Sequence, residues 1–225
     1  MKYNIRGTIL QVVDIELEEG ESVYTEAGGM AWMSPNIDME TSTKGGIMKG
    51  LGRMFAGESL FMATYTCNKG TGMISFANEF PGKIIPMELK QGESIIAQRD
   101  AFMCAESTVN MEMHFRKKLG AGLFGGEGFI MQKLSGPGTA FIEIAGEITK
   151  YTLKGDQMLK VDPGYLGMFE PNVAFDVTRV KGAKNILFGG EGLFLGTLKG
   201  PGDVWLQSMP LSNLAGRLRR FMPKG

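Results

Sequence analysis

The chain has 225 residues, and its 24 lysines and arginines balance its 24 aspartates and glutamates. This length buries a sizeable core without disulfide or metal staples, and a zero net charge gives no global field that attracts nucleic acid or an anionic membrane. No apolar run approaches the roughly 18 residues of a membrane span. Residues 1–6 carry no apolar leader segment, so we expect one domain over 1–225 with a cytoplasmic location and with Cys67 and Cys104 as buried thiols.

Strand patterns dominate the chain from its N-terminal part onward. Val13, Ile15 and Leu17 alternate with acidic residues, which is the period-two pattern of a half-buried strand. The same alternation recurs near residues 37–40, 109–114 and 175–178. No helical pattern of 10–15 residues separates these strands, so a parallel α/β sheet is not favoured. The sequence predicts an all-β fold.

Two motifs recur three times, in the same order. The first is a polar turn between apolar residues, at 17–23, 89–95 and 153–158. The second is an apolar pair, two small residues and a glutamate, at 54–58, 123–127 and 187–191. Motifs that repeat in order indicate one unit used several times. We therefore predict three β repeats, near 5–75, 80–147 and 148–210, around a pseudo-threefold axis.

The C-terminal segment has a helical pattern, and we predict a short helix over 211–222. Ser212 is its predicted N-cap. Large apolar residues follow one side at helical spacing, and arginines lie beside them: Leu211, Leu214, Leu218, Phe221, Arg217, Arg219 and Arg220. The favoured interpretation is that this helix docks on its own β-body. Packing on a neighbouring subunit, or on an anionic bilayer, stays open.

The search for catalytic residues is mostly negative. His114 is the only histidine, and it lies on the polar side of an alternating strand, where a solvated side chain is expected. The run Gly120–Gly125 spells G-x-G-x-x-G, but a dinucleotide site needs a preceding strand and a following helix. A strand pattern follows here instead. We expect no enzyme activity, no cofactor and no metal.

Three glutamates in the second motif are the most pointed polar candidates: Glu58, Glu127 and Glu191. If they met near the pseudo-threefold axis, they would bind a cation. The favoured alternative is that each accepts backbone N–H bonds within its own glycine-rich turn. Both roles explain why the glutamate repeats.

The apolar residues before those glutamates include Phe55, Phe124 and Phe188. Core or oligomer packing is the favoured role for them. A face that meets a membrane or a partner protein is the alternative.

These motifs resemble the altered inheritance of mitochondria protein 24 family. The resemblance is carried by residues 57–61, 126–129 and 190–194 and by the closing run Gly200–Ser208. It implies a β fold like that of the tryptophan RNA-binding attenuation protein (TRAP-like), related to the double-stranded β-helix, and it implies self-association. It brings no catalytic residues. RNA binding is not favoured, because recognition needs basic surface and stacking aromatics.

These observations predict a non-catalytic scaffold or binding protein, acting in a homo-oligomer such as a trimer or at a membrane surface. The alternative is a β-sandwich that binds a small ligand or a metal, including a metal-assisted hydrolase that uses the repeated glutamates.

Overall fold

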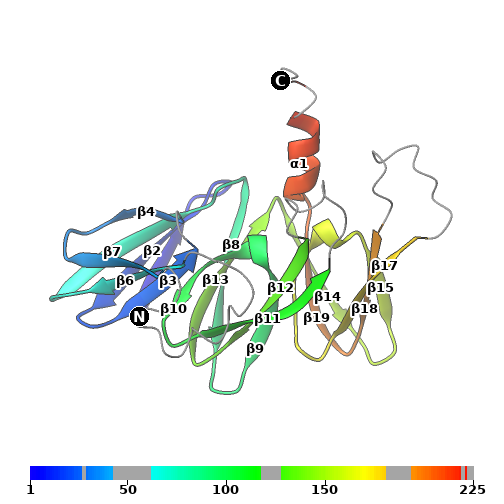
Figure 1. The fold of residues 1–225 in the computed structure, drawn as a ribbon, viewed down its shortest axis with the longest axis horizontal. Helices are drawn as coiled ribbons and strands as arrows, with labels where there is room; N and C mark the ends of the chain where they lie inside the picture. The colour runs from blue at the N-terminus through cyan, green and yellow to red at the C-terminus, as the bar shows by residue number, and fades with distance from the viewer. Residues whose placement is uncertain (27–28, 43–61, 118–127, 181–193, 219–220, 222–225) are drawn as a thin grey trace.

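The computed structural model of the chain describes residues 1–26, 29–42, 62–117, 128–180, 194–218 and 221. In these residues the strands form four antiparallel sheets, A to D, which follow one another along the longest axis of the molecule (Figure 1). One short helix, α1 (Leu211–Leu218), follows the last strand. The predicted all-β class with a short C-terminal helix is confirmed.

Sheets A and D lie at the two ends of the row. Sheet A contains β1 (Lys2–Arg6), β2 (Val12–Glu18), β4 (Met30–Met33) and β7 (Thr71–Ala77) in the order β1-β2-β7-β4. Sheet D contains β15 (Met158–Val161), β17 (Ala174–Arg179) and β18 (Phe194–Lys199) in the order β15-β18-β17.

Sheets B and C each have six strands. Sheet B contains β3 (Ser22–Glu26), β5 (Ile37–Ser42), β6 (Met62–Cys67), β8 (Gly82–Leu89), β10 (Phe102–Glu106) and β13 (Gly138–Ala145), in the order β5-β6-β3-β10-β13-β8. Sheet C contains β9 (Ser94–Gln98), β11 (Asn110–Lys117), β12 (Phe129–Ser135), β14 (Ile148–Leu153), β16 (Leu166–Phe169) and β19 (Gly202–Gln207), in the order β11-β12-β9-β16-β19-β14.

Three hydrophobic cores lie between the four sheets. The first joins residues of sheets A and B, the second joins B and C, and the third joins C and D. The alternation in β2 explains how a strand reaches a core, because Val13, Ile15 and Leu17 are fully buried while Glu16 and Glu18 face solvent. Each sheet between two cores is apolar on both faces.

The same order of pairings occurs in three strand sets, β2–β7, β8–β13 and β14–β19. In each set the first and third strands pair with the sixth. The second and fourth strands pair with the fifth. Two further pairings, β3 with β10 and β9 with β16, join neighbouring sets. The sets of one chain therefore form a row (Figure 1), and these pairings do not confirm the predicted pseudo-threefold axis.

The C-terminal helix differs from its prediction in two respects. It begins at Leu211, so Ser212 lies in its first turn and is not its N-cap. The first hydrogen bonds of the helix run from the backbone N–H groups of Asn213 and Leu214 to the Pro210 carbonyl. None of the helix residues is buried, and Figure 1 shows the helix projecting from the body. The favoured docking on the β-body therefore holds for the first turn, where Leu211, Ser212 and Leu214 are half-buried, and is wrong for residues 215–218, which are exposed. The helix is too short and too polar to cross a membrane, as are the other helical turns of the described residues.

Candidate functional site

The first repeated motif has a structural role in all three places. The side chains of Glu21, Glu93 and Gln157 each accept the backbone N–H of the residue three positions earlier, at 2.9, 2.9 and 2.8 Å. Each bond closes the turn between the first two strands of a set. This use of a side-chain oxygen to satisfy a turn N–H explains why the motif recurs with either an acid or an amide.

A second set of repeated hydrogen bonds was missed in the sequence. The Ser34 hydroxyl accepts from Met73 N at 3.0 Å. Glu106 accepts from Thr139 N at 2.7 Å, and Glu170 accepts from Asp203 N at 2.9 Å. In each case the side chain lies at the end of the third strand of a set or directly after it, and ties that strand to the sixth. The sequence gives little sign of this repeat, because serine stands at one of the three places and glutamate at the other two, and the two residue types have in common only a side-chain oxygen that accepts a hydrogen bond.

The predicted glutamates and phenylalanines of the second motif lie outside the described residues. They are Glu58, Glu127, Glu191, Phe55, Phe124 and Phe188. Arg219 and Arg220 also lie outside them, whereas Arg217 is an exposed residue of the last turn of α1. The sites proposed on the repeated glutamates and apolar tips therefore remain predictions.

The single histidine and the two cysteines lie where the sequence predicts. His114 on β11 is exposed, and partial burial together with the nearby Lys133 lowers its pKa. Cys67 and Cys104 are buried free thiols. In the described part of the chain, no group of three or more His, Cys, Asp or Glu side chains is placed to hold a metal ion.

The two ends of the row each have an edge strand whose counterparts in the middle of the row are paired on both sides. In sheets B and C, the second strand of one set pairs with the third strand of the next, as β3 with β10 and β9 with β16. At the ends of the row, the third strand of the first set, β4, and the second strand of the last set, β15, are edge strands. Sheets A and D thus each contain one half of the arrangement that is complete in B and C.

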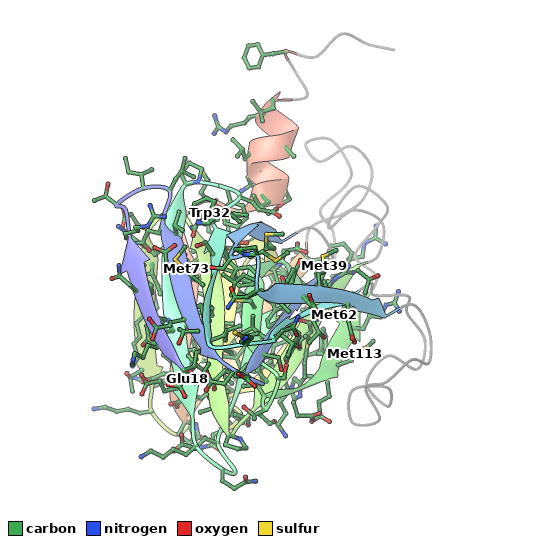
Figure 2. All side chains as sticks on the ribbon, turned by 90° about the vertical axis from the view of Figure 1, so that its left-hand side faces the viewer. Glu18, Trp32, Met39, Met62, Met73 and Met113 are labelled. Atoms are coloured by element: carbon green, nitrogen blue, oxygen red, sulfur yellow. The ribbon has the colours of Figure 1, made fainter. Side chains whose placement is uncertain are left out.

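The residues of β4 are exposed where their counterparts are buried. The pairing with the sixth strand has the same register and the same bulge in all three sets, so Trp32 corresponds to Cys104 and Met168, opposite Ser75, Phe141 and Trp205. Cys104 and Met168 are fully buried, whereas Trp32 is 42% exposed. Figure 2 shows Trp32, Met39 and Met73 on this end of the molecule.

A cavity of about 230 Å³ lies where the first set meets the second. Its charged lining residues are Glu26, Glu79, Arg99, Asp100 and Glu143. Glu26 ends β3, Arg99 and Asp100 belong to the 3-10 turn η2 (Arg99–Ala101), and Glu143 lies on β13. Apolar lining comes from Phe80, Phe102, Met103 and Leu211, the first residue of α1. The cavity therefore combines four carboxyl groups and one guanidinium with apolar walls.

Glu143 is the buried carboxyl group of this cavity, with 6% of its surface exposed. Glu79 N, 3.4 Å from Oε2, is its hydrogen-bond partner in the described residues. Burial, and next the charge of Glu79, raise the pKa of Glu143 to about 8. Arg99 Nε lies 3.3 Å from Glu26 Oε1 and forms an ion pair with it.

The chain is similar to known proteins over nearly its whole length. The model of the family described as Mitochondrial biogenesis AIM24 matches residues 3–209. An uncharacterized protein of Streptococcus pyogenes serotype M6 is 32% identical over 234 residues, covering 99% of this chain and 92% of the relative. An X-ray crystal structure of a Streptococcus pyogenes protein superposes with a TM-score of 0.79 at 27% identity, covering 98% of this chain and 99% of that chain.

Proposed function

We propose that this chain, which belongs to the mitochondrial biogenesis AIM24 family, is the building block of a head-to-tail homo-oligomer that serves as a non-catalytic scaffold. In this assembly the β15 edge of one copy pairs with the β4 edge of the next. Three copies closing into a ring is the proposed form, and the family resemblance implies self-association without a copy number. The observation that carries the proposal is the pair of edge strands left at the two ends of the row.

The internal junctions supply the template for this contact. Tyr24 lies opposite Ala105 at the first junction, and Ile96 lies opposite Phe169 at the second. Both pairs occupy the same positions of the second and third strands, as the shared registers of the three sets show. The equivalent contact between two copies places Lys160 opposite Met33. Sheets D and A would then form one composite sheet with the strand order of B and C.

The chemistry of the two edges supports such a contact. An edge strand presents unpaired N–H and C=O groups that pair with another strand. Trp32 and Met33 in β4, and Met158 in β15, are exposed apolar residues, and a large side chain contributes roughly 1.5–3 kcal/mol when its burial is complete. A contact between two different surfaces gives a closed ring or an open filament, depending on its geometry.

The predicted threefold repeat belongs to the same proposal. The three strand sets are then three copies of one β unit, and the pairing that joins neighbouring sets within a chain also joins the last set of one copy to the first set of the next. The TRAP-like relation and the cytoplasmic location remain part of the proposal. No catalytic residues are assigned, and the zero net charge does not favour nucleic acid as a partner.

Light scattering after size-exclusion chromatography tests the assembly. We expect the wild-type protein to have a multiple of the 24.5 kDa chain mass, three times that mass for the ring. Trp32→Glu places a carboxylate at a position whose counterparts Cys104 and Met168 are fully buried. It should return the protein to the mass of one chain, because burying an unpaired charge is costly.

Met113→Glu is the matched control, because Met113 is 43% exposed but lies on β11, at the outer edge of sheet C. This variant should keep the wild-type mass. A wild-type protein that is monomeric at tens of micromolar, or a Trp32→Glu variant with unchanged mass, would contradict the proposal.

A further inference from the structure

The two internal junctions differ in one pair of equivalent polar positions. Gln207 and Glu143 are equivalent, since they lie opposite Ile148 and Ile84 at matching positions of the sixth and first strands. Gln98 and Glu26 are equivalent at the ends of β9 and β3. The second junction therefore has two amides where the first has two carboxyl groups.

At the second junction the two amides satisfy one another and the backbone. Gln207 Nε2 donates to Gly164 O at 2.8 Å and to Gln98 Oε1 at 3.4 Å, while Gln207 Oε1 accepts from Ala145 N at 3.1 Å. A neutral amide with donors and acceptors is suited to such a closed network.

At the first junction the corresponding carboxyl groups line a cavity instead. Glu143 is more than nine-tenths buried, and the hydrogen bond that its carboxyl group accepts among the described residues is the long one from Glu79 N to Oε2, at 3.4 Å. Glu79 and Asp100 are exposed residues of the same lining, and Arg99 is the single cation against these four acids. A buried carboxylate without a full set of donors is costly, so the arrangement favours a ligand that brings donors and positive charge.

We propose that this cavity binds a small organic cation, a primary ammonium group attached to an apolar body. The ammonium donates to Glu143 and Glu26, and the apolar body packs against Phe80, Met103 and Leu211. The volume of about 230 Å³ suits a compact ligand, because drug-sized ligands occupy pockets of about 300–1,000 Å³. An ammonium group has three donors and no acceptor, which complements carboxylate oxygens. Arg99 Nε pairs with Oε1 of Glu26, so the ammonium would use the other oxygen, Oε2.

The cavity lies within one chain, between its first and second strand sets, so ligand binding does not require the head-to-tail assembly. The groups that face Glu143 are Glu79, Glu26, Arg99, Asp100 and the buried thiol of Cys104. When an ammonium binds, the Glu143 proton is released to the buffer and the carboxylate forms. The amine itself keeps its proton until about pH 10, so its affinity rises between pH 6.5 and 8.5.

Isothermal titration calorimetry with 2-phenylethylamine at pH 8.5 tests the proposal, and 2-phenylethanol is the uncharged probe of the same shape. We expect the amine to bind at least about tenfold more tightly than the alcohol, because hydrogen bonds between charged partners are about twice as strong as neutral ones. Glu143→Gln should weaken amine binding about tenfold or more. Glutamine already occupies the equivalent position 207, so the substitution suits the fold.

Glu147→Gln is the control, because it removes the same charge from an exposed residue that does not line the cavity. It should bind the amine like the wild type, and Glu26→Gln should weaken binding as Glu143→Gln does. No amine binding by the wild-type protein, equal binding of amine and alcohol, or equal affinities in Glu143→Gln and Glu147→Gln would overturn the proposal.

Discussion

At the residue scale, Glu143 links the stability of the fold to pH. Burial and the Glu79 charge raise the pKa of this carboxyl from its ordinary 4.5 to about 8. Between these values the unfolded chain has lost the proton and the folded chain keeps it. The folded state then binds more protons, so the free energy of unfolding falls as pH rises through this window. Above about pH 8 both states are ionised and this contribution is constant.

Glu143→Gln should remove that part of the pH dependence, because an amide does not ionise. Each unit of pKa difference corresponds to about 1.4 kcal/mol, so the wild type should lose stability relative to the variant as pH rises from 5 to 8. Urea unfolding at pH 5, 6.5 and 8 measures this difference, with Glu147→Gln as the control. Parallel curves for wild type and Glu143→Gln would show that the carboxyl is not held in its neutral form.

We expect an added methyl group to change the free energy of unfolding in opposite ways at two glycines. A Cβ on Gly82 would lie 2.0 Å from Ile144 O, in the pairing of β8 with β13, whereas a Cβ on Gly155 meets nothing within 4 Å. Gly82→Ala should lower the free energy of unfolding by about 1–3 kcal/mol through overpacking. Gly155→Ala should be neutral or gain up to about 1 kcal/mol. Chemical denaturation of both variants checks the contrast, and an equal loss would contradict the close approach at Gly82.

At the element scale, the C-terminal helix should be dispensable for stability. Its body contacts lie in the first turn, where Leu211 lines the cavity and Asn213 Nδ2 donates to Tyr165 Oη at 3.2 Å. Deleting residues 215–225 should change the free energy of unfolding by less than about 0.5 kcal/mol, as for surface changes in general. A thermal melt that shifts by more than a few degrees would show that residues beyond the first turn stabilise the body.

The sequence predicts the strands better than the helix because strand burial leaves a direct signal. Val13, Ile15 and Leu17 alternate with polar residues and are buried as expected. The apolar stripe of the tail predicts amphipathic character correctly, but Leu218 is 53% exposed. Periodicity identifies which face of a helix is apolar, and it does not reveal whether a surface of the same chain covers that face.

At the scale of the whole molecule, the repeated motifs predict the pairing pattern but not the ends of the row. The acids and amides at positions 21, 93 and 157 recur because each closes the same kind of turn. The motifs do not distinguish β4 and β15 from their paired counterparts, because a strand is an edge strand only through the lack of a neighbouring strand on one side. The cavity was also missed, because Glu26 and Glu143 are far apart in sequence and come together only through the β3–β10 and β10–β13 pairings.

Mass measurement on a mixture of two blocked variants tests the head-to-tail assembly most directly. Trp32→Glu blocks the β4 edge, and Met158→Asp combined with Lys160→Asp blocks the β15 edge at two exposed positions. Each variant alone should be a monomer of about 24.5 kDa. Their equimolar mixture should form a complex of one copy of each, because one free β15 edge then meets one free β4 edge. A mixture that stays monomeric while the wild type is oligomeric, or variants that keep the wild-type mass, would contradict the account.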